Sequence, residues 1–272
     1  MAKENQRVVL VTGASSGIGL ACATHLAAQG FRVYGTSRRP NAALQGAVTM
    51  LAADVTDDRS VEQAVAAVLN REQRLDILVN NAGMGIAGPV EDTSIELAKS
   101  QLDVNFFGAF RGCRAVLPQM RSQRSGYIVN IGSIGGLIAI PFQGFYSASK
   151  FALEGFSEAL RLEVGPLGIH IVLIEPGDHR TSFTQNRRST RGSEVGSPYQ
   201  DRFERAIARM ASDEQGGPNP EGIARLLLKV LNHPRPRLRY TVGPAAQRAA
   251  VWIKRTMPYA VMEKIMQDYY SR

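Results

Sequence analysis

The sequence predicts an α/β fold in which one doubly wound, mostly parallel sheet is flanked by helices. Short apolar runs alternate with segments of helical periodicity from the beginning of the chain. These runs are rich in Val, Ile and Leu on both faces, as in strands of a parallel sheet that is covered by helices. A glycine-rich turn joins the first run to the first helical segment. Repeated strand–helix units favour right-handed crossovers and therefore an open sheet.

The elements follow in order along the 272 residues, which we expect to form a single domain over residues 1–272. Seven strands are predicted, at residues 7–12, 31–36, 48–53, 76–80, 127–131, 170–174 and 238–242. Helices are predicted at residues 17–29, 59–70, 100–121, 145–164 and 198–211. The polar stretch 178–220 is expected to be a long substrate loop. Residues 244–272 are expected to form a C-terminal helical extension.

Composition limits the compartment and the class of protein. The two cysteines, Cys22 and Cys113, form no disulfide framework and no Cys/His ligand cluster, so free thiols and no metal are expected. The apolar run at residues 7–12 passes directly into the glycine turn, unlike a signal peptide. No run approaches the ~20 apolar residues of a membrane span. We expect a cytoplasmic protein.

The formal charge of +8 is concentrated near the end of the chain. Residues 221–272 contain ten Lys/Arg and three Asp/Glu, which leaves a net +7. This charge indicates a solvated basic face or, alternatively, a surface that meets an anionic membrane or an acidic substrate. The basic residues match no nucleic-acid-binding module, so no nucleic-acid partner is expected.

The turn TGASSGIG at residues 12–19 has the spacing of a phosphate-binding loop. Glycines at 13, 17 and 19 allow a tight turn and a close approach of a pyrophosphate to the main chain. The N–H groups at the start of the following helix then favour an anion. We expect the turn to hold a dinucleotide, although such a motif can also be only a turn. The residues assigned to this site are Gly13, Ser15, Ser16, Gly17, Ile18 and Gly19.

The end of the second strand favours NADP(H) over NAD(H). It presents Ser37, Arg38 and Arg39, and no acidic residue lies in segment 31–40. A carboxylate at this position would bind the ribose 2′-hydroxyl of NAD, whereas an arginine can bind a 2′-phosphate. Arg38 is the preferred contact. Two solvent-exposed arginines without a ligand are the alternative.

Tyr146 and Lys150 lie at positions i and i+4 of a predicted helix and therefore share one face. A nearby ammonium favours the phenolate, which makes a tyrosine a usable proton donor and acceptor. The same spacing also occurs in ordinary surface pairs. Ser133 follows the strand at 127–131, where a hydroxyl can hold a substrate oxygen, and Asn105 is a polar residue within a long helix.

In combination these motifs resemble the short-chain dehydrogenase/reductase superfamily in its single-domain Rossmann form. The matching segments are TGASSGIG (12–19), Asp54 in LAADVT, NNAG (80–83), Asn105, Ser133, YSASK (146–150) and PG (176–177) with Thr181. They occur in the family's order and cover about residues 7–181. The resemblance implies an enzyme that interconverts a carbonyl and an alcohol by hydride transfer.

The resemblance also implies a role for each matching residue. Tyr146 would be the acid/base, Lys150 would lower its pKa and bind the nicotinamide ribose, and Ser133 would orient the carbonyl. Asn105 would hold a water that links Lys150 to solvent. Asp54 would bind the adenine amino group. Further cofactor contacts would come from Val55, Asn80, Asn81, Ala82, Gly83, Pro176, Gly177 and Thr181. A non-catalytic NADP-binding sensor on the same fold is the alternative function.

The substrate is expected to be hydrophobic. Candidate pocket residues are Met84, Ile134, Leu137, Phe142, Phe145 and His179, although core packing explains such apolar residues equally well and His179 can be a plain loop residue. A looser resemblance is to the 17β-hydroxysteroid-dehydrogenase-like branch, and it rests on the segment EPGDHRTSF, the long loop and the tail. That likeness implies a bulky ketone or aldehyde of steroid, retinoid or lipid type.

The tail at residues 258–272 has an apolar stripe at helical spacing. It can pack on the domain or on a second subunit, cover the substrate mouth, or lie on a lipid surface as a peripheral membrane contact. The family resemblance implies a homodimer or homotetramer formed through the helices at 100–121 and 145–164.

Overall fold

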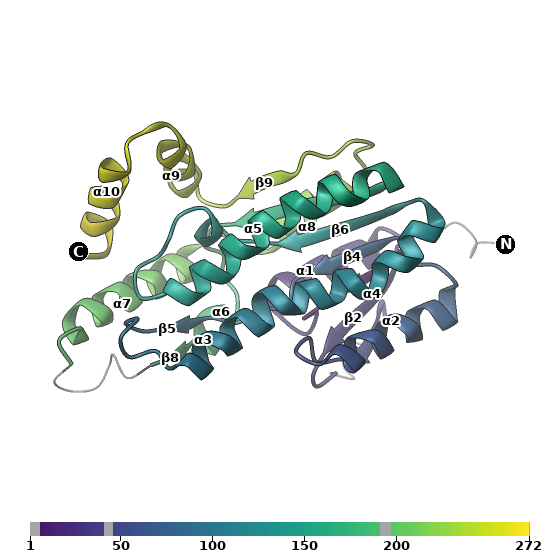
Figure 1. Ribbon diagram of the computed structural model, residues 1–272, viewed down its shortest axis with the longest axis horizontal. Helices are drawn as coiled ribbons and strands as arrows, with labels where there is room; N and C mark the ends of the chain where they lie inside the picture. Colours follow the sequence, from purple (N-terminus) through teal and green to yellow (C-terminus); the bar gives the residue numbers. More distant parts are fainter. Residues whose placement is uncertain (1–5, 41–45, 191–196, 272) are drawn as a thin grey trace.

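The computed structural model describes residues 6–40, 46–190 and 197–271 (Figure 1). Within these residues seven strands form one sheet in the order β3-β2-β1-β4-β6-β7-β9, and every pairing in it is parallel. The predicted doubly wound sheet is confirmed. The strands are β1 (Val8–Val11), β2 (Arg32–Ser37), β3 (Val48–Ala52), β4 (Ile77–Asn80), β6 (Gly126–Ile131), β7 (Ile169–Pro176) and β9 (Arg239–Val242).

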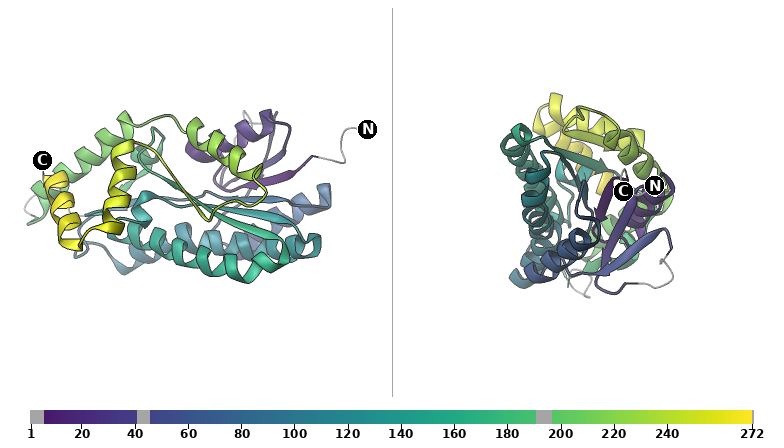
Figure 2. Two further views of the ribbon diagram at one scale, coloured as in Figure 1. Left: turned by 90° about the horizontal axis from the view of Figure 1, so that it is seen from above. Right: turned by 90° about the vertical axis from the view of Figure 1, so that its right-hand side faces the viewer.

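Helices cover both faces of this sheet (Figure 2). On one face, α1 (Gly17–Ala28) and α8 (Glu221–Leu231) pack against Val9 and Val11 of β1. On the other, Val8 and Leu10 face α2 (Asp58–Glu72), α4 (Gly108–Gln123) and α5 (Gly144–Val164). Successive side chains of a strand point to opposite faces, so four apolar residues in a row bury on both sides. A short 3₁₀ turn, η4 (Gly165–Leu167), joins α5 to β7.

The long helix predicted at residues 100–121 begins earlier and is not uniform. It starts as α3 (Ile95–Leu102), where Ser94 caps the first turn by accepting a hydrogen bond from the Leu97 N–H at 3.2 Å. It continues through one π-helical turn, η2 (Asp103–Phe107), into α4. Such π-turns often occur at functional sites, and this one contains Asn105.

Much of the segment that we expected to be a substrate loop forms two helices and a short strand. It contains α6 (Phe183–Asn186), β8 (Arg188–Ser189) and α7 (Gln200–Gly216), while residues 191–196 lie outside the described residues. Strand β8 pairs in parallel with β5 (Ile86–Ala87) in a separate two-stranded sheet. The helix predicted at 198–211 corresponds to α7, but the prediction ends too early because the chain remains helical to Gly216.

The C-terminal extension forms two helices, α9 (Ala245–Thr256) and α10 (Tyr259–Ser271), called the lid helices below. Together with α7 they stand at the end of the molecule toward which the strands run (Figures 1 and 2). A small cluster holds them there: Val251 and Met262 pack against Ile138, with Leu137 and Met266 at its edge.

Both cysteines are buried free thiols, as expected. Within the described residues the structure contains no helix with the length and apolar character of a membrane span.

Candidate active site

A cavity of about 960 Å³ lies at the carboxyl ends of the strands. This edge is where open parallel sheets bind ligands. One half of the cavity is bounded by the glycine turn and by the ends of β2, β3 and β4. The other half is bounded by α6, α7 and the lid helices. Tyr146, Lys150 and Ser133 line it as well.

The glycine turn is shaped by contacts that leave no room for side chains. Gly13 has a φ of 66° and Gly17 a φ of 55°, a region that glycine adopts without strain. A Cβ on Gly13 would lie 2.9 Å from the Cα of Ala82. The Asn81 side chain fixes the turn by donating to the carbonyl oxygens of Thr12 at 2.9 Å and Gly13 at 3.1 Å. The turn therefore keeps its main chain open toward the cavity.

The start of α1 fits an anionic group. Ser16 is the N-cap residue, and its side chain makes no capping hydrogen bond. Ser16, Gly17 and Ile18 line the cavity, so the first N–H groups of α1 and its positive dipole end lie at the cavity wall. A pyrophosphate is the kind of ligand that such an arrangement binds. Thr181 closes over this point, with its Cβ 3.4 Å from the position of a Cβ on Gly17.

Arg38 lies at the cavity wall, whereas Arg39 does not. The Ser37 hydroxyl is occupied by the main chain of Arg39: it donates to the carbonyl oxygen at 3.0 Å and accepts from the N–H at 3.2 Å. Arg38 is exposed, and its guanidinium is within electrostatic range of Asp54. Burial alone would raise the pKa of Asp54, but hydrogen bonds from Thr56 and the charge of Arg38 hold that pKa below its usual value.

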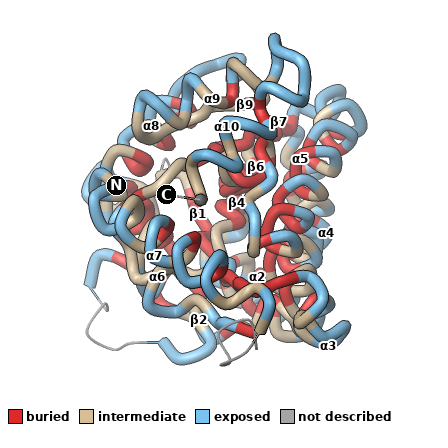
Figure 3. The backbone as a smooth tube through the Cα atoms, turned by 90° about the vertical axis from the view of Figure 1, so that its left-hand side faces the viewer, coloured by how far each residue is buried: buried red, intermediate tan, exposed pale blue. Residues whose placement is uncertain are grey.

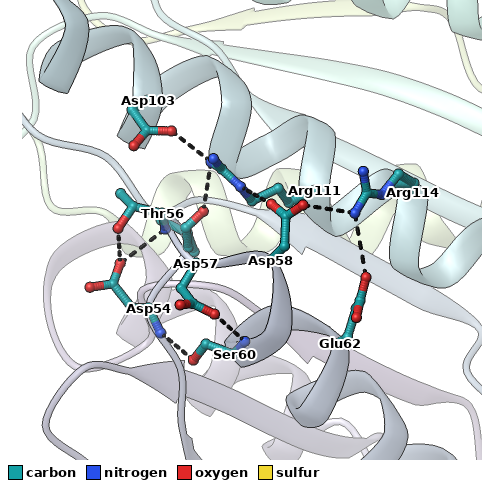
Figure 4. Close-up of polar contacts among 10 residues, drawn as sticks. Asp54, Thr56, Asp57, Asp58, Ser60, Glu62, Asp103, Arg111 and Arg114 are labelled. Atoms are coloured by element: carbon teal, nitrogen blue, oxygen red, sulfur yellow. Dashed lines mark hydrogen bonds and ion pairs between the residues drawn. The ribbon is translucent and has the colours of Figure 1, made fainter.

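The segment that contains Asp54 is anchored by an arginine that the sequence analysis did not identify (Figure 4). Arg111 of α4 donates to the Val55 carbonyl oxygen at 3.2 Å and pairs with Asp103 at 2.7 Å and with Asp58. It thereby ties the β3–α2 connection to the π-turn. Its only sequence signal is an arginine one turn after LDVNFFG, which is too common to identify the role.

Tyr146 is buried in the cavity wall. Burial raises the pKa of its phenol to about 12, and a hydrogen bond with the Ser133 side chain opposes the rise. Glu214 and Asp178 add to the rise through their charges. The ring of Phe183 packs beside the phenol with centroids 5.7 Å apart. Tyr146 is therefore a protonated phenol at neutral pH.

Lys150 lies one helical turn beyond Tyr146 and is 6% exposed. Its ammonium donates to the carbonyl oxygen of Ile131 at 2.8 Å. Burial lowers the pKa of Lys150 to about 8, and the charge of Glu154 opposes this shift. Most of the lysine is consequently protonated at neutral pH, and a single turn of α5 presents both a neutral phenol and an ammonium.

The Asn105 side chain is used to position the main chain. Its amide nitrogen donates to the carbonyl oxygen of Met84 at 3.0 Å and to the Ser149 hydroxyl at 3.1 Å, and its oxygen accepts from the Met84 N–H at 2.9 Å. Asn105 thus holds the segment after NNAG beside α5. A water path from Lys150 through Asn105 stays a prediction.

Asn80 lies away from the cavity, unlike Asn81. It is buried between β4, β6 and α4, and its amide donates to Asn130 at 2.9 Å and to the Ala109 carbonyl oxygen at 3.2 Å. Asn80 therefore ties the central strands to α4 and does not line the adenosine side. Neighbouring residues of a strand point to opposite faces, and this separates the two asparagines.

The half of the cavity beneath the lid helices is largely apolar. Ala250 and Ile253 of α9 and Met262, Ile265 and Met266 of α10 face it, together with Met210 of α7. Met84, Ile134 and His179, three predicted pocket residues, also line the cavity. The other three lie elsewhere: Leu137 packs in the cluster under the lid, Phe142 packs on Phe203 with centroids 5.5 Å apart, and Phe145 is half-buried outside the cavity wall.

Acidic side chains on this side of the cavity are engaged within the protein. Glu214 forms a buried ion pair with Arg187 and accepts a hydrogen bond from Thr184. Asp178 and Gln247 exchange two hydrogen bonds, one through the Asp178 N–H at 2.9 Å. Burial raises the pKa of Asp178 to about 6. The pair Asp178–Gln247 fastens α9 to the end of β7.

His179 is buried at the cavity wall with its Nδ1 2.9 Å from the carbonyl oxygen of Gly177. A carbonyl oxygen only accepts hydrogen bonds, so Nδ1 is the ring nitrogen that carries the hydrogen in this contact. Burial lowers the pKa of His179. It is therefore a neutral side chain in the wall, in keeping with contact to an uncharged ligand.

Comparison with known proteins places this site in a family. A profile of the short chain dehydrogenase family matches residues 7–192.

The chain belongs to the short-chain dehydrogenase/reductase family.

Three relatives show how far the similarity extends. The 3-ketodihydrosphingosine reductase of Bacteroides thetaiotaomicron is 43% identical over 97% of this chain and 98% of its own length. The human 17-beta-hydroxysteroid dehydrogenase type 1 is 40% identical, over 86% of this chain and 76% of its own. The crystal structure of a short-chain dehydrogenase from Streptomyces avermitilis superimposes with a TM-score of 0.82 at 33% identity, covering 99% of this chain and 98% of that one.

As a member of the short-chain dehydrogenase/reductase family, the protein is an oxidoreductase that acts on a CH–OH or C=O group and binds a nicotinamide cofactor. All four predicted catalytic residues line the cavity described above. The predicted cofactor residues line it too, with three exceptions: Gly19, Arg39 and Asn80. Gly19 packs inside the glycine turn. The predicted residues that share the cavity are Asn105, Ser133, Tyr146, Lys150, Gly13, Ser15, Ser16, Gly17, Ile18, Ser37, Arg38, Asp54, Val55, Asn81, Ala82, Gly83, Pro176, Gly177 and Thr181.

The sequence left open whether the tail covers the substrate mouth, and in the structure the lid helices form one wall of the cavity. Phe183 was not identified from the sequence. A Cβ on Gly85 would lie 2.7 Å from the Phe183 ring, so Gly85 leaves room for this ring beside Tyr146. The amphipathic pattern of the tail was the available signal for the lid. It could not show which element the apolar stripe faces.

Proposed function

We propose that this protein is an NADP(H)-dependent reductase for a ketone carried by a long hydrophobic lipid, with Tyr146 as the proton donor. The observation that carries the proposal is the continuity of the cavity. One space connects the phosphate-binding turn, the Tyr146–Lys150 pair and the apolar chamber under the lid helices.

NADP(H) is favoured by the charge at the end of β2. The described residues of this segment offer Ser37 and Arg38 at the cavity wall, with no carboxylate in segment 31–40 of the sequence. A guanidinium forms strong charge-assisted hydrogen bonds with a phosphate, and a 2′-phosphate is the group that distinguishes NADP from NAD.

Tyr146 is suited to protonate a carbonyl oxygen as negative charge develops on it. Its phenol is neutral at pH 7 because burial raises its pKa, and Ser133 is hydrogen-bonded to it. A carbonyl oxygen held between these two hydroxyls accepts a hydrogen bond from each, and the phenol proton then moves to that oxygen. A nicotinamide cofactor supplies the hydride when bound. The ammonium of Lys150 favours the phenolate that remains until solvent returns a proton.

A flexible chain suits the chamber because its walls are mostly unbranched or aliphatic side chains. Met210, Met262 and Met266 adapt to irregular ligands. The 3-ketodihydrosphingosine reductase matches over nearly its whole length, and its name gives a keto lipid as its substrate. The steroid dehydrogenase matches less of both chains.

The test is NADPH oxidation measured with a panel of ketones under matched conditions. The panel comprises 3-ketodihydrosphingosine, a 3-keto fatty acyl ester, estrone and retinal, each also offered with NADH. We expect turnover of the long-chain ketones with NADPH and little turnover of the ring systems.

Two results would overturn parts of the proposal. Faster reduction of estrone or retinal would contradict the long-chain substrate. Tight NADPH binding without turnover of any compound would favour a non-catalytic NADP-binding sensor.

A further inference from the structure

The lid helices carry an outward surface that the oxidoreductase chemistry does not use. We propose that this surface docks on an anionic lipid bilayer and holds the mouth of the cavity against it. The surface consists of Arg248, Trp252, Arg255, Met257 and Tyr259, and it is called the lid surface below. Binding to lipid is independent of the proposed reaction, whereas the delivery of substrate from the bilayer depends on it.

Helix α9 has two opposite faces with different chemistry. Ala246, Ala250 and Ile253 line the cavity. Arg248, Trp252 and Arg255 each follow one of them by two residues, which is a rotation of about 200° about the helix axis. The same helix therefore has an apolar stripe toward the cavity and a stripe of two arginines and a tryptophan on the far side.

The outer stripe is exposed. Trp252 is 66% exposed and Tyr259, just beyond the turn between the lid helices, is 71% exposed. Met257 in that turn is exposed as well. Large apolar and aromatic side chains gathered on one projecting corner are costly in water and mark a binding surface. Figure 3 shows α10 largely exposed at this end of the molecule.

The charge on the stripe favours an anionic partner. Helix α9 contains Arg248, Lys254 and Arg255 and no acidic residue. Within the described residues neither Arg248 nor Arg255 forms an ion pair, although the charge of Arg255 also reaches buried Glu175 and opposes the rise in the pKa of that carboxyl. Lys254 points inward and donates to the Leu137 carbonyl oxygen. Arginines one turn on either side of an exposed tryptophan suit the interface of a bilayer, where aromatic rings lie at the level of the headgroups.

A lipid surface accounts for the position of the stripe better than a second copy of the chain does. The corner is formed by two helices that stand clear of the sheet (Figures 1 and 2). Ile265 of α10 lines the cavity and is also exposed, so the apolar chamber reaches the outside beside this corner. In the docked state a chain leaving the bilayer would meet apolar residues at the cavity mouth.

The chain provides its own probe, because Trp252 is its single tryptophan. The experiment follows the emission of Trp252 in the full-length protein as vesicles are added. One set of vesicles is phosphatidylcholine, and the other is phosphatidylcholine mixed with phosphatidylglycerol. We expect a blue shift and co-sedimentation with the anionic vesicles only, reversed by added salt, and quenching by brominated acyl chains.

Variants assign the effect to the lid surface. Replacing Arg248→Gln or Arg255→Gln should weaken partitioning about fivefold each, because one surface cation contributes on the order of 1 kcal/mol to binding of an anionic membrane. Arg225→Gln, at an exposed arginine on α8, is the matched charge control. Tyr259→Ala should weaken binding while it keeps the probe, and Ile95→Ala, at an isoleucine 62% exposed on α3, is the matched apolar control.

Three outcomes would overturn the proposal. One is an emission that stays unchanged with both vesicles. Another is equal binding to neutral and anionic vesicles that the arginine variants do not alter. The third is a blue shift that follows protein concentration without lipid, with a dimer in sedimentation, because a second copy would then cover the stripe. Reduction of a detergent-dispersed substrate is measured in parallel, so that loss of vesicle binding is distinguished from failure of the proposed function.

Discussion

The cofactor half of the cavity and the lid half are built in different ways. The glycine turn, Asn81 and the ends of β1 and β4 are joined by main-chain contacts and by hydrogen bonds between buried groups. The lid helices are held by one small apolar cluster and by side-chain contacts: the Asp178–Gln247 pair, the Lys254–Leu137 hydrogen bond, and the contacts of Tyr269 with Asp213 and Arg209. The difference indicates that the first half is a fixed template and that the second half can open without unfolding the sheet.

The largest expected effect falls on the fixed half. Tyr146→Phe removes the proposed proton donor and keeps the ring that packs on Phe183. We expect kcat to fall by about 10²–10⁴-fold, the range in which general acids contribute. Binding of NADPH, followed by fluorescence titration, should change little. A variant that keeps its activity would show that another group supplies the proton.

The comparison is sharpened by two methionines, one in the sheet core that supports the first half and one in the lid cluster. Met120 is fully buried in the sheet core and Met262 in the lid cluster. Met120→Ala should lower the free energy of unfolding by about 2–5 kcal/mol, the usual cost for a buried methionine. Met262→Ala should lower it by less than about 1 kcal/mol and raise the substrate KM, because the lid opens locally.

Urea unfolding followed by circular dichroism, together with steady-state kinetics, measures both effects. If Met262→Ala loses as much stability as Met120→Ala, the lid folds together with the sheet and the contrast between the halves is wrong.

Replacing Lys150 tests whether the fixed half contains a group that lowers the stability of the fold but is needed for activity. Its pKa is about 8 in the folded protein and 10.5 without the fold. Between these two pH values the unfolded chain binds more protons than the folded protein, so the free energy of unfolding rises with pH across this window. Below pH 8 the folded protein carries the buried charge, and there the cost of burying it is greatest. Lys150→Met should therefore be inactive yet more stable at pH 7, by on the order of 1–3 kcal/mol.

The gain should disappear above the unfolded pKa of 10.5, which thermal unfolding at several pH values measures. Lys229→Met, at an exposed lysine of α8, is the control and should show no such dependence. A Lys150→Met protein less stable than the parent at pH 7 would mean that the hydrogen bond to Ile131 outweighs burial.

The smallest expected effect concerns the choice of cofactor. Arg38→Asp places a carboxylate at the cavity wall near Asp54. We expect the ratio of kcat/KM for NADPH over NADH to fall by about 10–100-fold, equivalent to 1.4–2.7 kcal/mol. Arg39→Asp is the matched control, because Arg39 does not line the cavity. An unchanged ratio in Arg38→Asp would remove Arg38 from the phosphate site.

Much of the cofactor half could be predicted because its signals are local. Gly13 and Gly17 need positive φ, and Tyr146 and Lys150 share a face only because α5 is a helix. The adjacent asparagines show the limit of such reasoning. Both belong to the same motif, yet Asn80 is buried against Asn130 while Asn81 holds the glycine turn. The alternation of side chains between the two faces of the sheet separates them, and only the fold shows what lies on each face.

The sequence by itself determined the parallel sheet, the place of the glycine turn and the Tyr146–Lys150 pair, because each follows from backbone geometry over a few neighbouring residues. Tertiary structure alone decided that Arg111 anchors the Asp54 segment, that Phe183 packs on Tyr146, and that the tail covers the cavity. These contacts join residues far apart in the chain. An apolar or charged side chain has many possible partners, and only the packed fold selects one of them.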